Sequence, residues 1–113
     1  MGLDLRVYID KYHGKMNEWF IGSESLSFHR DYGLFDIISN FPAQPITDEK
    51  IKFQEYNEDG IHVRNTDPYG EPLTFVRAEA FKEIDYVPNQ WNNSILLFLK
   101  SLPSDTIVIL YWE

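Results

Sequence analysis

Apolar side chains occupy every second position at the start of the chain: Leu3, Leu5, Val7 and Ile9. A two-residue period is typical of a strand that buries one face, so we expect the first strand here. The polar stretch 11–15 contains Gly14, which favours a hairpin loop. Residues 16–21 are then expected to return antiparallel to the first strand, and a further short strand is expected around Leu26 and Phe28.

A helical pattern follows Asp31, a residue type that caps helix starts. Leu34, Phe35 and Ile38 share one face of the expected helix. Asn40 is expected to close it.

Two more helices are expected in the second half of the chain. Thr74 can cap a helix that runs to Ile84. The clearest helix begins at Asn89, and its predicted buried stripe comprises Trp91, Ile95, Phe98, Leu99 and Leu102. Its other side carries Leu96 and Leu97, so we expect this helix to be covered by more than one layer.

The remaining segments are expected to be strands and turns. Residues 48–56 stay open, because they alternate like a strand but begin with two acids that suit a first helical turn. Residues 61–63 are expected to form a short strand, and Asp-Pro-Tyr-Gly at 67–70 fits a type I turn. The final run, 106–112, has β-branched or apolar residues at both odd and even positions, and therefore on both faces of a strand. This pattern predicts a central strand beside the first one.

These elements predict an α+β fold, a mostly antiparallel sheet of four or five strands with two or three helices packed mainly on one face. A length of 113 residues fits a single acidic domain, residues 1–113. The chain has no cysteine, which excludes disulfides and thiolate chemistry. Its apolar runs are far shorter than the ~20 residues that span a bilayer, so we expect a cytoplasmic protein without membrane contact.

Charge limits the classes of partner. The chain has 18 Asp and Glu residues against 10 Lys and Arg residues, for a net charge of −8. Its bases are scattered, whereas nucleic-acid binding needs clustered bases, so no direct nucleic-acid contact is expected. Residues 55–85 hold eight acids and three bases and contribute −5 of the net charge. This segment is either a solvated face that keeps the protein soluble or a docking surface for a basic partner.

Aromatic residues bear on the second interpretation. Trp19 and Phe20 are adjacent on an expected strand, so they point to opposite faces and one of them is expected to be exposed. Exposed aromatic residues anchor protein interfaces, but small domains also fill their cores with them. The candidate partner-binding residues are the acids of the acidic segment and one loop tyrosine, expected on one flank of the molecule: Glu55, Glu58, Asp59, Asp67, Tyr69, Glu71, Glu79, Glu83 and Asp85.

Catalytic motifs are weak in this chain. Residues 29–31 spell His-Arg-Asp like a protein-kinase catalytic loop, but Asp36 stands where that loop has its metal-binding Asn. A metal site is the remaining enzymatic hypothesis. Its weak candidate ligands are Asp59 and His62, with His29, Asp31 and His13 as further ligands if the fold brings them together. A histidine between two apolar strand residues usually points to solvent, and no cofactor is expected.

Several short motifs are spread over the chain. It opens Met-Gly-Leu-Asp, continues Arg-Asp-Tyr-Gly-Leu-Phe at 30–35, and ends in an apolar aromatic run at 107–112. The combination resembles small uncharacterised phage and prophage proteins that begin Met-Gly-(Cys/Leu)-Asp and carry an Arg-Asn-Tyr-x-Leu-Phe helix start. Many members also carry Asp-Gly-His-Ser-His, whereas residues 69–75 here hold no histidine, so no metal role is carried over. The resemblance implies an origin in a mobile element and no particular activity.

Three functions stay open. The first is a small acidic phage-type binding protein that engages and inhibits a host protein with a basic surface, such as a nucleic-acid-binding defence factor of the CRISPR-effector kind. The second is a small metal-dependent hydrolase or nucleotide-processing enzyme. The third is a homo-oligomeric structural protein built by edge pairing of its sheet. The weak catalytic motifs favour the first.

Overall fold

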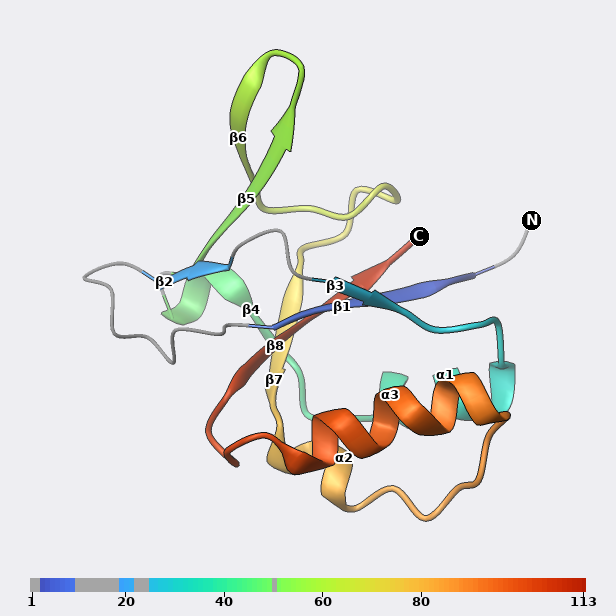
Figure 1. Ribbon diagram of the computed structural model, residues 1–113. Coiled ribbons are helices and arrows are strands. Elements are labelled where there is room, and N and C mark those ends of the chain that lie inside the picture. The colour runs from blue at the N-terminus through green and yellow to red at the C-terminus, as the bar shows by residue number, and fades with distance from the viewer. Residues whose placement is uncertain (1–2, 10–18, 22–24, 50) are drawn as a thin grey trace.

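Figure 1 shows the computed structural model, which describes residues 3–9, 19–21, 25–49 and 51–113, with only the backbone at 19–21, 48–49, 55–57 and 61. Five strands form an antiparallel sheet in the order β3-β1-β8-β7-β4: β1 (Leu5–Ile9), β3 (Ser25–Ser27), β4 (Gln44–Pro45), β7 (Thr74–Arg77) and β8 (Ile107–Trp112). A smaller sheet joins β2 (Trp19–Ile21), β5 (Ile51–Asn57) and β6 (Gly60–Arg64) in the order β2-β5-β6. The helices are α1 (Tyr32–Ser39), α2 (Glu79–Lys82), α3 (Gln90–Ser101) and a 3₁₀ helix, η1 (Ile46–Glu49).

The α+β fold predicted from the sequence is confirmed, and so is the place of the last strand. β8 lies between β1 and β7, with Val7 opposite Leu110 and Val76 opposite Val108. All of β8 except Trp112 is buried. A strand with two neighbours and two covered faces buries side chains of both parities, which explains its continuous apolar run.

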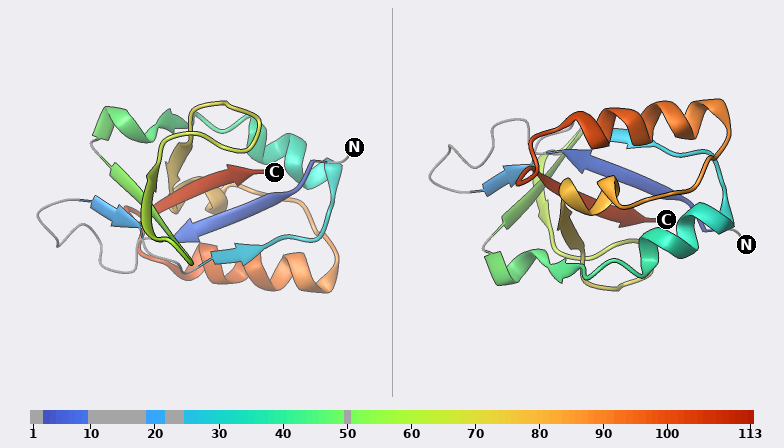
Figure 2. Two further views of the ribbon diagram at one scale, coloured as in Figure 1. Left: turned by 90° about the horizontal axis from the view of Figure 1, so that it is seen from above. Right: turned by 90° about the horizontal axis from the view of Figure 1, so that it is seen from below.

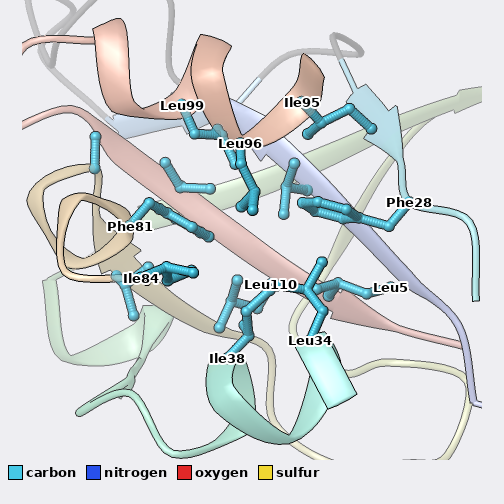
Figure 3. Close-up of a cluster of buried hydrophobic side chains, with 14 of the residues drawn as sticks. Leu5, Phe28, Leu34, Ile38, Phe81, Ile84, Ile95, Leu96, Leu99 and Leu110 are labelled. Carbon is cyan, nitrogen blue, oxygen red and sulfur yellow. The ribbon is translucent and has the colours of Figure 1, made fainter. Parts of the chain in front are cut away.

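The three α-helices pack on one face of the five-stranded sheet (Figure 2). The largest core lies there, between the apolar residues of the sheet and the inward faces of the helices (Figure 3). It includes Leu5, Leu34, Phe81, Leu96 and Leu110, each of which is almost fully buried. Burial of this kind contributes about 1.5–3 kcal/mol for each large apolar side chain.

The opposite face of the sheet is also covered, by η1 and the base of β5 (Figure 2). Three rings meet there, because Tyr8 packs edge-on against Phe53 at 4.7 Å and against Tyr111 at 5.8 Å between ring centroids. Ile46 and Leu73 complete the cover over this second core. Most aromatic residues of the described core therefore serve packing.

α1 begins and ends where the sequence predicts. The Asp31 side chain accepts a hydrogen bond from the Leu34 backbone N–H at 3.1 Å, which is an N-cap. Leu34, Phe35 and Ile38 are buried, and Asn40 is the C-cap. Asn89 likewise caps α3 by accepting from the Asn92 N–H at 2.8 Å.

Two predictions of secondary structure and strand pairing are wrong, for residues 74–77 and for residues 19–21. Residues 74–77 form β7 rather than the first turn of a helix, because a β-branched and aromatic stretch beside β8 gains a full ladder of hydrogen bonds. Only Glu79–Lys82 is helical in that stretch. The segment 19–21 does not return along β1 but pairs parallel with β5.

Other predictions are settled or lie outside the described residues. The open segment 48–56 divides into the end of η1 and most of β5. The hairpin loop expected at 11–15 and the orientations of the Trp19 and Phe20 side chains are not described. Among the helices of the described residues, none combines the length and the apolar character needed to span a membrane.

Candidate functional site

The β5–β6 hairpin carries two of the predicted partner-binding acids at its tip. Glu58 and Asp59 are exposed in the turn, where Gly60 adopts a positive φ of 111°. His62 is exposed on β6 and lies opposite Glu55 in the β5–β6 ladder. For Glu55, only the backbone is described. Gly60 supplies the left-handed backbone that a tight turn of this kind requires.

Asp67 is not available to a partner. Its side chain is only 7% exposed. Its Oδ1 accepts hydrogen bonds from the backbone N–H groups of Tyr69 at 2.8 Å and Glu71 at 3.1 Å. The Gly70 N–H also donates to the Asp67 carbonyl at 3.0 Å, as the predicted turn requires. The carboxylate therefore organises the turn, and of the three predicted residues there Tyr69 and Glu71 are exposed.

The last three predicted acids lie at α2. Glu79 and Glu83 line a hollow of about 530 Å³ beside Arg77, and Asp85 follows on the exposed surface. The nearby bases donate to neutral oxygens instead of these acids: Arg77 to the Asp105 carbonyl at 3.1 Å, Lys82 to the Ser104 hydroxyl at 2.7 Å, and Lys100 to the Ile84 carbonyl at 3.1 Å. The acids at α2 have no ion pair with any other described residue.

The predicted acids do not share one flank of the molecule. Figure 1 places the β5–β6 hairpin at one end and α2 at the other, with the five-stranded sheet between them. The reason is β7, which carries the chain from the hairpin end to the α2 end. The acids of residues 55–85 are therefore divided in space, and those at α2 lie apart from those at the hairpin tip.

The predicted metal ligands do not converge either. In the part of the chain that the structure describes, no group of three His, Asp or Glu side chains is placed to hold a metal ion. The Asp31 carboxylate caps α1 and accepts the Tyr86 hydroxyl at 3.0 Å, and the His29 ring stacks on Trp91 at 5.6 Å. His62 sits on the hairpin, and His13 lies outside the described residues.

An apolar hollow lies between the edge strand β3 and α3. It has a volume of about 340 Å³ and is lined by Ile9, Ser25, Leu26, Trp91, Ser94, Ile95 and Phe98. Trp91 and Phe98 are large, yet 51% and 44% exposed. We name this feature the β3–α3 groove. Half-exposed aromatic side chains beside an uncharged hollow are a common form of contact surface for another molecule.

Both walls of the groove are held in place by hydrogen bonds. The Trp91 Nε1–H donates to the Ser27 carbonyl at 3.0 Å, which fixes the indole against β3. Asn92 is fully buried and binds the His29 backbone twice: its Oδ1 accepts from the N–H at 2.7 Å, and its Nδ2 donates to the carbonyl at 2.9 Å. The start of α3 is therefore tied to the end of β3 from two sides.

The described groups with a shifted pKa form side-chain hydrogen bonds or ion pairs between chain segments, and none of them lines the groove. Two hydrogen bonds from Arg30, at 3.0 and 2.8 Å, hold the pKa of the Asp4 carboxyl below 3.8. The hydrogen bond to Tyr8 is the largest of the causes that raise the pKa of Arg6, which also pairs with Glu113 at 3.0 Å. The hydrogen bond to Asp31 raises the pKa of Tyr86 above 10.0. Except for the Arg6–Tyr8 hydrogen bond within β1, these hydrogen bonds and ion pairs join residues that are far apart in sequence, so they have a structural role.

Comparison with known proteins found no matching family, no similar curated protein and no similar solved structure. The phage resemblance therefore stays a prediction, and the candidate site rests on geometry alone.

The sequence does not reveal the groove, because the hydrophobic pattern predicts that the aromatic residues of the groove are buried in the core. Trp91 and Phe98 belong to the stripe predicted to be buried, together with Ile95 and Leu99. The structure centres the buried face on Asn92, Ile95, Leu96 and Leu99, which leaves the two aromatic residues on its edge. A polar Asn at the centre of a buried face gives no signal in a hydrophobic pattern.

Proposed function

We propose that the protein works by binding another protein, and that the β3–α3 groove is its contact surface. One observation carries this proposal: Trp91 and Phe98 stay half exposed around a hollow whose described lining is apolar and uncharged, on the surface of a small chain with a net charge of −8. Trp, Tyr and Phe are enriched at protein interfaces, and Trp is enriched among the few residues that carry most of the binding energy there.

The groove offers little to catalysis. Its hydroxyls belong to Ser25 and Ser94, and its described lining contains no histidine, acid or base that could activate them. The geometry therefore supports binding over the hydrolase alternative.

Charge supports a basic partner. At −8 the protein attracts a positively charged surface and repels acidic ones, which accelerates association and makes it sensitive to salt. The acids at α2 and the acids at the hairpin tip lie at opposite ends of the described structure, and both groups contribute to this field. We further propose, from this charge and the phage resemblance, that the partner is a nucleic-acid-binding host protein whose activity is inhibited, as a phage-encoded antagonist of host defence requires.

The test is affinity capture from a bacterial lysate with three immobilised proteins: the wild type, Phe98→Ala and Leu97→Ala. Leu97 is the matched control, because it is 58% exposed on α3 but does not line the groove. A partner retained by the wild type and by Leu97→Ala, and lost from Phe98→Ala, supports the proposal. The proposal is wrong if nothing is retained, or if every retained protein is bound equally by Phe98→Ala.

A further inference from the structure

We infer that the β3–α3 groove takes an extended, basic segment of the partner protein, which pairs antiparallel with the outer edge of β3 and inserts one large apolar side chain between β3 and α3. This inference rests on the proposed function, because it specifies how the partner is held.

The register of the sheet shows which groups of β3 face outward. Val7 lies opposite Leu26, and the Phe28 N–H donates to the Leu5 carbonyl at 3.1 Å on the same ladder. Backbone groups alternate in direction along a strand, so the groups of Leu26 face β1 and those of Ser25 and Ser27 face away from it. β3 is the end strand of its sheet as described, so these two residues form a sheet edge.

That edge has hydrogen-bonding capacity to spare. The Ser27 carbonyl accepts from Trp91, but the N–H and carbonyl of Ser25 and the N–H of Ser27 have no hydrogen bond with another described residue. Ser25 and Ser27 are exposed. Unpaired edge groups of this kind are a template for an added strand, which satisfies them in the same way as a strand of the sheet does.

The groove lies where a side chain of that added strand points. Leu26 is directed to the helical face of the sheet and forms part of the hollow with Trp91, Ile95 and Phe98. A residue paired opposite Leu26 has its side chain on the same face, and therefore in the hollow. Its two neighbours lie opposite Ser25 and Ser27 and point to the other face. They exchange hydrogen bonds with these two residues, and the Ser27 carbonyl, which has two lone pairs, then accepts from the added strand as well as from Trp91.

Charge selects the occupant. A second copy of this chain also carries −8, so pairing of two β3 edges brings like charges together, whereas a basic segment is attracted. No charged side chain lines the described groove, which fits an apolar residue at the inserted position and places the basic residues on either side of it. An extended segment fits better than a helix because only an extended segment pairs with Ser25 and Ser27.

The probe is a short synthetic peptide in which lysine alternates with apolar residues around a central phenylalanine. Binding to isotope-labelled protein is followed by nuclear magnetic resonance. We expect the amide protons of Ser25 and Ser27 to shift and to exchange at least about tenfold more slowly with solvent in the complex. We also expect the Trp91 indole N–H to shift, because it lies at the end of the paired edge.

Backbone methylation of the peptide separates strand pairing from simple insertion of a ring. Methylating the nitrogens of the two lysines beside the phenylalanine removes the groups that face Ser25 and Ser27, and is expected to weaken binding about 30-fold. Methylating the phenylalanine nitrogen is the matched control, since that group faces away from β3 in the antiparallel pairing, and is expected to change affinity less than about threefold. Equal binding of the two methylated peptides overturns the inference.

Further outcomes would overturn the inference or the proposed function. The inference is wrong if the peptide does not bind, if it binds as a helix, or if Ser25 and Ser27 become protected with rising protein concentration in its absence, which indicates a second copy. If Phe98→Ala loses the partner captured from lysate while the peptide fails, the proposed function stands and only the mode of binding falls. If both fail, the groove is not a protein-binding surface.

Discussion

Asn92 shows how one buried polar side chain can fix the relation of two elements. Its amide meets both the N–H and the carbonyl of His29, so the same side chain acts as acceptor and donor. Asn92→Asp keeps the size but replaces the donor with an anionic oxygen facing a carbonyl. We predict a loss of about 2–4 kcal/mol of unfolding free energy, measured by urea denaturation. Asn93→Asp, a half-buried neighbour outside this pair, is the control and is expected to change stability by less than about 0.5 kcal/mol.

Tyr86 gives a pH-dependent prediction at the same scale. Its hydroxyl donates to both oxygens of Asp31, at 3.0 and 3.2 Å, and this hydrogen bond raises the pKa of Tyr86 above 10.0. A raised pKa in the folded state means that the contribution is complete below pH 10.0 and is lost as the pH rises through the folded-state value. We predict that the melting temperature of the wild type falls more steeply above pH 10.0 than that of Tyr86→Phe. Parallel curves for the two proteins contradict this role.

The turn before β7 is the clearest prediction at the scale of an element. Charge alone predicts partner binding for Asp67, yet its carboxylate accepts hydrogen bonds from the backbone N–H groups of Tyr69 and Glu71. Asp67→Ala leaves both donors without an acceptor, and we predict a loss of about 2 kcal/mol in a denaturant titration. Glu71→Ala, which removes an exposed acid from the same turn, is expected to leave stability within about 0.5 kcal/mol. A larger loss for Glu71→Ala than for Asp67→Ala would refute this assignment.

Elements were predictable from the sequence where local signals and packing agree. Asp31, Asn89 and the 67–70 turn combine a suitable residue type with a suitable position, so caps and turn appear as expected. Thr74 is a case in which the local signal gives the wrong element. It is a reasonable helix cap by type, but pairing with Leu110 of β8 decides its conformation, and that partner is 36 positions away in sequence.

The candidate site was less predictable than the fold for the same reason. Residues 25–27 and 91–98 come together only in the folded chain, where Trp91 reaches the Ser27 carbonyl. Net charge, in contrast, was available from composition but did not reveal that the predicted acids divide between the hairpin and α2. Composition thus gives the sign of the protein's own net charge, whereas the candidate contact surface depends on long-range packing.

At the scale of the whole molecule, charge and contact are expected to act separately. The described part of the protein measures 37 × 34 × 24 Å. The Debye length, over which dissolved salt screens a charge, is only about 8 Å at physiological salt. Charge should therefore raise the association rate at low salt, by about tenfold or more, and leave the dissociation rate little changed. We predict equal effects on association from Glu79→Gln/Glu83→Gln and from Asp36→Asn/Glu71→Gln, measured by surface plasmon resonance with the captured partner. A much larger effect of the first pair points instead to direct docking at α2.

The most direct test of the proposed contact surface is hydrogen–deuterium exchange on the complex with the partner captured from lysate. The β3–α3 groove predicts slower exchange in residues 25–27 and at the exposed side of α3, with no change at the hairpin tip, 58–60, or in α2. Protection at the hairpin tip or in α2, with β3 and α3 unchanged, would contradict the account and return the contact to the acidic residues.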